Sequence, residues 1–195
     1  MKFTIKEKNR IFQEFFRVDR LDLEIDTFAG GRLPMRRYHL ERPEVVALVL
    51  YNPEKDSIIL VKQFRYSSIK KDTDDGWTLE IVGGLIDPGE APEESALRES
   101  EEETGFRPKR VEFLTSSFAS VGISNELIHL YVGLVTEEDR VASGGGIAHE
   151  NEDILVIEMP FQEALQQIKN GIITDAKSIL GIQWLALKLA GVGPF

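Results

Sequence analysis

The chain contains no cysteine, only three histidines among its 195 residues, and no long apolar run. The lack of cysteine excludes disulfides, thiolate zinc sites and cysteine nucleophiles. No apolar stretch approaches the ~20 residues that a membrane-spanning helix needs, so no membrane insertion is expected. The first eight residues carry lysines without an apolar stretch behind them. A secretory signal is therefore not expected, and the cytoplasm is the predicted compartment.

Basic residues are also scarce. The 33 aspartates and glutamates outnumber the 23 lysines and arginines, which gives a formal net charge of -10. Such a field repels the phosphates of nucleic acid, so the composition argues against nucleic-acid binding and favours a cationic ligand if the acidic residues cluster. The length suits one domain, or one domain with a short appendage.

The N-terminal residues predict a small β unit. Residues 21–26 alternate apolar and acidic side chains, which is the pattern of a half-buried strand. Gly30 and Gly31 offer a turn, and residues 36–40 can return as the second strand of a hairpin. Because such a hairpin has little core of its own, we expect it to dock on its own domain or on a partner chain. We assign residues 1–42 to this extension and residues 43–195 to the main domain.

Strands and helices mix without strict alternation in the main domain. Residues 45–51 are apolar on both faces, as in a central strand. The remaining strands are predicted at 57–65, 77–82, 111–118, 127–135 and 154–157, and the helices at 92–104, 161–170 and 175–190. The glycines at 144–146 indicate a flexible loop. The pattern predicts an α/β (α+β) fold, with a mixed sheet covered by helices rather than a doubly wound parallel sheet.

The helix predicted at 92–104 carries the strongest functional signal. Glu99, Glu102 and Glu103 occupy positions i, i+3 and i+4, so they share one helix face. Like charges at this spacing repel, but a row of carboxylates beside a glycine-rich loop offers the hard oxygen ligands that Mg²⁺ or Mn²⁺ prefers. A solvated acidic face is the commoner explanation for such a cluster taken alone.

The residues around the cluster favour the metal site. Residues 84–106 match the pattern G-x5-E-x7-R-E-U-x-E-E-x-G-U, where U is apolar, and so resemble the signature of the Nudix hydrolases. Seven fixed positions would coincide by chance on the order of once in 10⁸. The single departure is Ser100 at a usually apolar position, where a small hydroxyl can pack or bond back to the helix. The matching residues are Gly84, Glu90, Arg98, Glu99, Glu102, Glu103, Gly105 and Phe106.

This resemblance implies a Nudix fold, with the mixed sheet between helices (α/β/α), and a site that holds Mg²⁺ or Mn²⁺ against a diphosphate. Arg98 is expected to pair with Glu90 and to orient the helix carboxylates, whereas Glu101 lies off the shared face and is expected only to be solvated. The metal ligands that the resemblance implies are the backbone carbonyl of Gly83 and the carboxylates of Glu99, Glu102 and Glu103.

The loop after the three glycines is expected to supply a further acid. In the family branch that the chain resembles, such a loop brings a glutamate that acts as general base or late metal ligand. Glu150 matches that position best, and Glu152 is the alternative. The catalytic residues implied by the resemblance are therefore Glu150 or Glu152, together with Glu103. An acidic loop without a catalytic role is the other explanation.

Segments outside the signature are similar to the ADP-ribose pyrophosphatase and nucleoside-diphosphate-sugar branch of the Nudix family, namely 61–66, 77–84, 145–154 and 178–185. The resemblance implies hydrolysis of ADP-ribose or a related nucleotide sugar to a nucleoside monophosphate and a sugar phosphate. UDP-glucose or GDP-mannose is the alternative substrate, and a non-hydrolysing nucleotide-binding regulator is a more distant one. Val121 replaces a proline of the ADP-ribose branch, as in UDP-sugar pyrophosphatases. The residues expected to contact substrate are Arg65, Tyr66, Trp77 and Glu126.

Some of these residues also allow a structural explanation. Arg65, at the end of a strand, could clamp a diphosphate or form a surface ion pair. Phe64 is expected in the core, and Trp77 could stack on a base or fill the core. His129 is expected to be a structural strand residue. Members of this branch commonly exchange N-terminal strands, so the resemblance implies a homodimer.

Overall fold

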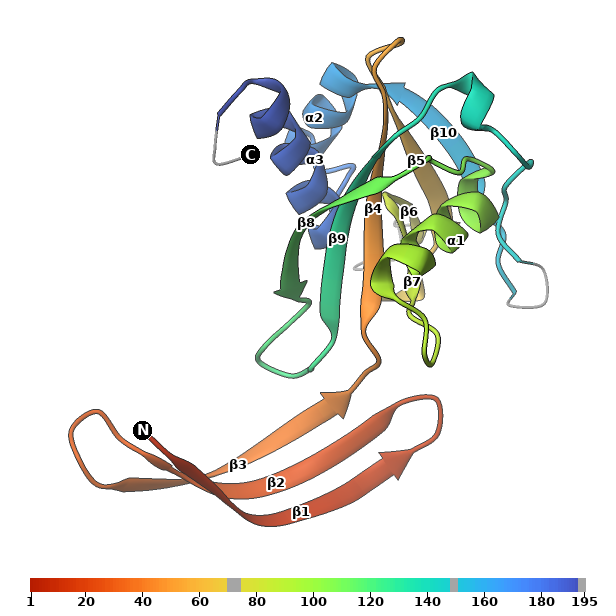
Figure 1. Cartoon of the computed structure of the whole chain (residues 1–195). Coiled ribbons are helices and arrows are strands. Elements are labelled where there is room, and N and C mark those ends of the chain that lie inside the picture. The colour runs from red at the N-terminus through yellow and green to blue at the C-terminus, as the bar shows by residue number, and fades with distance from the viewer. Residues whose placement is uncertain (70–74, 148–150, 193–195) are drawn as a thin grey trace. The chain divides into compact units, whose positions relative to one another are not determined.

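The computed structural model describes residues 1–69, 75–147 and 151–192 (Figure 1). It divides into two compact units. The N-terminal unit comprises residues 1–44 and 118–127, and the main unit comprises residues 45–117 and 128–195. Within the described ranges, no helix is both long and apolar enough to cross a membrane.

The N-terminal unit contains a three-stranded antiparallel sheet of order β1-β2-β3, formed by β1 (Phe3–Gln13), β2 (Arg17–Asp26) and β3 (Arg32–Glu41). The predicted hairpin is therefore incomplete, because a further strand precedes it. The many charged side chains of β1 interrupt the apolar alternation by which a strand is predicted from sequence. The same side chains form ion pairs with β2. Lys8 and Arg10 both reach the buried carboxylate of Asp19, at 2.9 and 2.5 Å. Cross-strand ion pairs of this kind stabilise a sheet that has little apolar core.

The main unit is built on a seven-stranded sheet of order β10-β5-β4-β9-β8, with β6 paired to β5 and β7 paired to β4. The central strand β4 runs parallel to β9 and antiparallel to β5 and β7, so the sheet is mixed, as predicted. The strands are β4 (Val45–Asn52), β5 (Ser57–Phe64), β6 (Trp77–Glu80), β7 (Val82–Leu85), β8 (Val111–Phe118), β9 (Leu127–Leu134) and β10 (Leu155–Pro160).

Helices cover both faces of this sheet (Figure 1). One face of β4, formed by Val46, Leu48 and Leu50, packs in a core with residues of α1 (Pro92–Thr104) and with Phe106. The other face packs in a second core with α2 (Phe161–Lys169) and α3 (Ala176–Leu189). The apolar run on both faces of β4 is explained by these two cores, and the predicted α/β/α layering is confirmed.

The predicted helices are confirmed, and their ends follow from local chemistry. Pro92 opens α1, and Gly105 ends it in the left-handed conformation with a φ of 77°. Asp175 caps α3 by accepting a hydrogen bond from the backbone N–H of Ser178 at 2.9 Å.

The single strand predicted at 77–82 is two strands. Between β6 and β7, the backbone N–H of Ile81 donates to the hydroxyl of Ser178 on α3 at 2.9 Å instead of to a neighbouring strand. Gly83 and Gly84 consequently lie inside β7, not after a strand end, and pair with Ala47 and Val46 of β4. This places the glycine pair directly beside α1.

Candidate active site

Gly83 and Gly84 let the carboxylates of α1 approach the sheet backbone. The backbone N–H of Gly83 donates to Oε2 of Glu103 at 3.2 Å. A Cβ added to Gly84 would lie 2.1 Å from the carboxyl carbon of Glu99, so any side chain there would collide with that group. The glycine pair thus fixes two of the predicted ligands, Glu99 and Glu103, against β7.

Of these two carboxylates, that of Glu103 is buried without an ion-pair partner among the described residues, whereas that of Glu99 is 12% exposed and pairs with Arg98 at 2.8 Å. Glu103 is only 2% exposed, and burial is the main reason why its pKa is raised to about 8. Burial likewise raises the pKa of Glu99 to about 7. The negative charge of Glu152 adds to both increases. A site of this kind favours a bound cation.

Arg98 connects the acidic residues of the helix. Its Nε and Nη2 each bind one carboxylate oxygen of Glu90 at 3.1 Å, and its Nη1 binds Glu99 and Glu102, both at 2.8 Å. Nη2 also donates to the carbonyl of Leu85 at 3.1 Å. Hydrogen bonds from Arg98 are the leading cause of the lowered pKa of Glu90, about 2. Arg98 is therefore placed where it can set the orientation of the helix carboxylates.

The donor set fits a divalent cation of the magnesium type. Within the described residues, no group of three or more Asp, Glu or His side chains stands ready to hold a metal ion, and Arg98 takes the position of a counter-charge for Glu99 and Glu102. The donors are nevertheless hard carboxylate oxygens, of which that of Glu103 is buried and that of Glu99 is only 12% exposed.

The segment with three glycines is attached to the end of α1. Gly145 donates to the carbonyl of Glu103 at 2.9 Å, and Gly146 donates to the carbonyl of Glu102 at 3.0 Å. All three glycines have positive φ, and a Cβ on Gly144 would lie 2.4 Å from the backbone of Thr104. The expectation of a flexible loop is wrong for this part, because the glycines permit close backbone contact and satisfy helix carbonyls that would otherwise lack partners.

Of the two candidate general bases, the structure describes Glu152. Glu150 lies outside the described residues. Glu152 accepts a hydrogen bond from the backbone N–H of Ile147 at 3.0 Å, which turns it back toward the glycine segment. Glu152 lies against Gly146, where an added Cβ would be 2.7 Å from its own Cβ, and Gly146 is bonded to the carbonyl of Glu102.

Arg65 pairs with a buried carboxylate, that of Glu80, which also binds Lys177. Its Nε lies 3.1 Å from Oε1 of Glu80, and Nζ of Lys177 lies 2.7 Å from Oε2 of the same carboxylate. Burial alone would raise the pKa of Glu80, but the charge of Lys177 and the hydrogen bonds from Arg65 outweigh it and lower that pKa to about 2. Burial would lower the pKa of Arg65, and Glu80 raises it. The ion pair expected as one alternative for Arg65 therefore exists.

The sequence interpretation missed Glu80 and Lys177. Two signals were present. Glu80 is a single acid between Leu79 and Ile81 in an otherwise apolar segment, and Lys177 is a cation in the first turn of a helix, where the dipole favours acids.

Comparison with known proteins decides the family. The model of the NUDIX domain matches residues 41–180. The chain belongs to the Nudix family. A GDP-mannose pyrophosphatase of Cronobacter sakazakii is 36% identical over 182 residues, covering 93% of this chain and 94% of the relative. An ADP-ribose pyrophosphatase of Haemophilus influenzae is 36% identical over 185 residues, covering 92% and 84%. The crystal structure of an ADP compounds hydrolase shares the fold, with a TM-score of 0.75 at 22% identity over 98% of this chain and 96% of that one.

Three aromatic side chains near Arg65 are partly or largely exposed, and one of them, Phe64, was expected in the core. Phe64 of this Nudix chain is 50% exposed, so its placement in the core was wrong. Its ring meets Trp77 edge to face at 5.9 Å, and Trp77 itself is half-exposed. Tyr66 projects into solvent. Phe64 and Trp77 thus form a partly exposed apolar surface at the end of the β5–β6 pair.

Glu126, the remaining residue expected to contact substrate, lies in the N-terminal unit and pairs with Arg42 at 3.0 Å.

Two polar residues of the Nudix helix make contacts outside their own helix. Ser100 is fully buried, so it packs, which was one of its two expected roles, and its hydroxyl donates to the carbonyl of Phe106 at 2.7 Å in the turn after α1. Glu101 is not merely solvated, because it pairs with Arg107 at 2.6 Å on the outer face. His129 lies in β9, as expected, with Nδ1 3.1 Å from the Ser116 hydroxyl.

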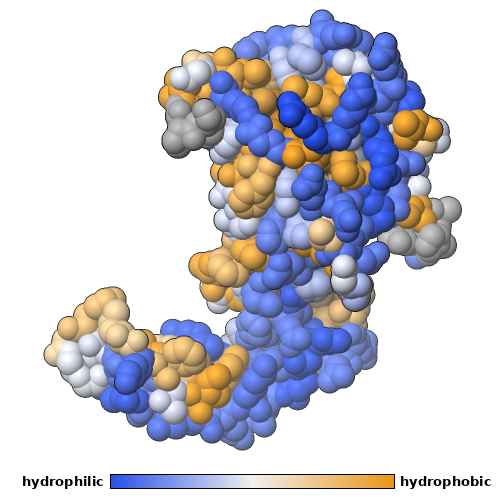
Figure 2. Space-filling view, in the orientation of Figure 1, coloured by the Kyte–Doolittle hydropathy of each residue, from blue (hydrophilic) through white to orange (hydrophobic). Residues whose placement is uncertain are grey.

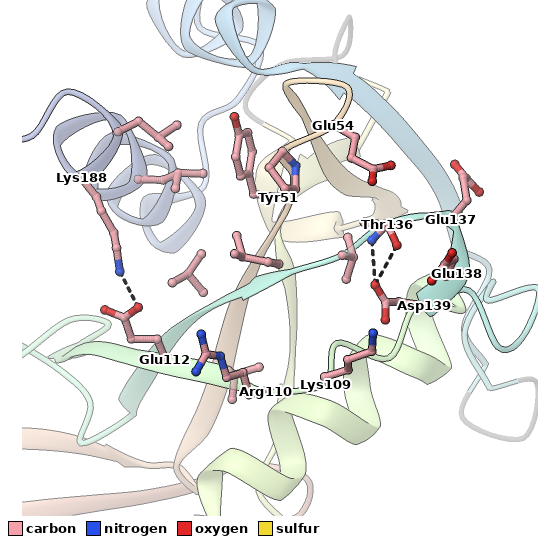
Figure 3. A pocket seen from close by; sticks show the side chains of 17 residues that line it. Tyr51, Glu54, Lys109, Arg110, Glu112, Thr136, Glu137, Glu138, Asp139 and Lys188 are labelled. Atoms are coloured by element: carbon pink, nitrogen blue, oxygen red, sulfur yellow. Dashed lines mark hydrogen bonds and ion pairs between the residues drawn. The ribbon is translucent and has the colours of Figure 1, made fainter.

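A cavity of about 920 Å³ lies at another place in the Nudix domain (Figure 3). Tyr51, near the end of β4, lines it together with the beginning of β8 and part of α3, whereas the glycine pair of β7 lies beside the beginning of β4. Polar side chains surround an apolar interior, and Lys188 pairs with Glu112 at one side. Among the predicted site residues that the structure describes, none lines this cavity.

Proposed function

We propose that the protein is a divalent-metal-dependent hydrolase that splits the diphosphate bond of ADP-ribose or a related nucleoside diphosphate sugar. The observation that carries this proposal is the buried carboxylate of Glu103, held at Gly83 without an ion-pair partner among the described residues, beside the largely buried carboxylate of Glu99 over Gly84. Membership of the Nudix family and relatives named GDP-mannose and ADP-ribose pyrophosphatase support it. The cytoplasm stays the predicted compartment.

The proposed ligands for Mg²⁺, or Mn²⁺ in its place, are Glu99, Glu102, Glu103 and the carbonyl of Gly83. A bound ion of this type would neutralise the diphosphate and lower the pKa of water. Arg98 keeps the carboxylates in position through its contacts with Glu90, Glu99 and Glu102.

The remaining roles fall to residues around the cluster. Arg65 is proposed to bind the diphosphate with the part of its guanidinium that Glu80 leaves open, since its side chain is 47% exposed. Glu150 or Glu152 accepts the proton of the attacking water or orients that water. The exposed rings of Tyr66 and Trp77 are suited to stack on a base. Glu126 keeps its proposed contact with substrate.

The identity of the sugar nucleotide separates the candidate activities. The names of the relatives favour GDP-mannose and ADP-ribose, and Val121 favours a UDP-sugar such as UDP-glucose. A regulator without hydrolytic activity is disfavoured, because the acids of the signature are all present.

A substrate panel tests the proposal. Purified protein with Mg²⁺ is expected to release nucleoside monophosphate from at least one of ADP-ribose, GDP-mannose and UDP-glucose, and to lose this activity in EDTA. Ranking kcat/KM across the three compounds identifies the substrate. If nucleotide binds in calorimetry but no monophosphate forms with Mg²⁺ or Mn²⁺, the regulator is the correct alternative.

We also propose a homodimer formed through the N-terminal unit. This unit exposes large apolar side chains, among them Phe3, Phe15 and Phe28, and Figure 2 shows hydrophobic surface amid the polar surface of this unit. Light scattering is expected to give twice the chain mass of 22.0 kDa. A mass of one chain at micromolar concentration would contradict the dimer.

A further inference from the structure

The buried carboxylate of Glu80 lies between two cations. Its Oε2 binds Nζ of Lys177 at 2.7 Å and lies 3.4 Å from Nη2 of Arg65, while its Oε1 binds Nε of Arg65 at 3.1 Å. The hydroxyl of Thr78 donates to Oε1 at 2.6 Å. Both oxygens of this carboxylate are thus satisfied, and its side chain is only 5% exposed.

The two cations differ in how freely they can meet a ligand. The Lys177 side chain is 17% exposed and also contacts Asp175 at 3.0 Å, whereas the Arg65 side chain is 47% exposed. Lys177 therefore belongs to the protein interior, and Arg65 has an open side. The aliphatic part of Lys177 lies against Gly83, because a Cβ on Gly83 would lie 3.3 Å from its Cε.

We infer that Lys177 is a positioning residue that keeps the charge of Arg65 available for the substrate diphosphate. A single buried carboxylate attracts whichever cation can reach it. With Lys177 present, Glu80 is already neutralised, so the guanidinium of Arg65 can share its positive charge with a phosphate. Without Lys177, Arg65 becomes the only counter-charge of Glu80 and is drawn away from the ligand. This inference rests on the proposed function, and it adds a residue that does not itself touch substrate.

The test is a kinetic comparison on the best substrate of the panel, with Mg²⁺. K177M is expected to raise KM about tenfold while kcat changes less than threefold, because one charge-assisted phosphate contact is weakened. K177R keeps the cation and is expected to return KM to within threefold of the wild-type value. K188M, on the same helix, removes a lysine that pairs with Glu112 elsewhere, and it is expected to leave both constants unchanged.

Two double variants identify the route of the effect. In R65A, adding K177M is expected to have no further effect on KM, because the two residues act through one contact. E80Q/K177M removes the carboxylate that competes for Arg65, so its KM is expected to return toward the wild-type value. This variant also removes the buried carboxylate that K177M leaves without its lysine, which protects the fold if K177M alone is unstable.

The outcomes are distinct. A fall in kcat at constant KM, an additive effect of K177M in R65A, or a KM for E80Q/K177M as high as that of K177M would each overturn the role of Lys177 and leave the hydrolase proposal in place. A wild-type protein that hydrolyses none of the sugar nucleotides would overturn the proposed function, and the role of Lys177 with it.

Discussion

Replacing Glu103 with glutamine is expected to reduce hydrolysis of the sugar nucleotide at least about a thousandfold, since a metal-dependent step loses several kcal/mol of charge stabilisation. Glu103 is 2% exposed and lies beside Gly83, so it is placed to be the innermost ligand. Glutamine has nearly the same size, and the fold should therefore survive. Steady-state kinetics and calorimetric titration with Mg²⁺ and Mn²⁺ are the measurements.

Glu101→Gln is the matched control for this substitution. Glu101 lies on the same helix, but its carboxylate faces outward and pairs with Arg107. An exposed pair of this kind contributes at most about 1 kcal/mol, so both turnover and stability should stay close to wild type. Full activity of E103Q, or an equal loss in E101Q, would show that the metal assignment is wrong.

Gly84→Ala is expected to give the second-largest effect, a loss of turnover of about a hundredfold with little change in stability. The added methyl group would occupy the place of the Glu99 carboxylate, 2.1 Å from its carboxyl carbon. That carboxylate is the end of a flexible side chain and can move at low cost, and the backbone of Gly84 does not require a positive φ. The fold can therefore accommodate the methyl group, but a proposed ligand is displaced.

Gly171→Ala is the control for this substitution, and it is expected to lower stability while turnover is kept. Gly171 follows α2 with a φ of 73° and has open space where a Cβ would lie. Alanine there strains the backbone by about 1 kcal/mol without approaching the carboxylates, so stability should fall while turnover is kept. Thermal unfolding and kinetics on both variants are sufficient. Normal activity of G84A would mean that Glu99 is not needed where the structure places it.

The layers of the main unit and the carboxylate helix could be predicted from sequence because their signals are local. Pro92 and Gly105 mark the helix ends, and the apolar run of β4 indicates burial on both faces. The spacing of Glu99, Glu102 and Glu103 indicates a shared face on any helix. Each of these inferences depends on residues within a few positions of one another.

The features that sequence did not reveal depend on distant segments. Lys177 meets Glu80 across 97 positions, and the hydroxyl of Ser178 takes the N–H of Ile81 over the same separation. The partners of Gly145 and Gly146 are helix carbonyls about 43 positions earlier, so glycine content alone suggested flexibility where the backbone is in contact. Strand β1 was missed because ion pairs to β2, rather than apolar alternation, hold it in place.

The hydrogen bonds from Gly145 and Gly146 to the last turn of α1 have a consequence for protein engineering. These hydrogen bonds connect the glycine segment to the backbone that carries Glu102 and Glu103. Transplanting residues 84–105 alone into another scaffold would remove these two hydrogen bonds. The proposed ligands would then sit on a helix end whose carbonyls have lost their partners. A functional graft must carry residues 141–152 along with the helix, as a single cassette.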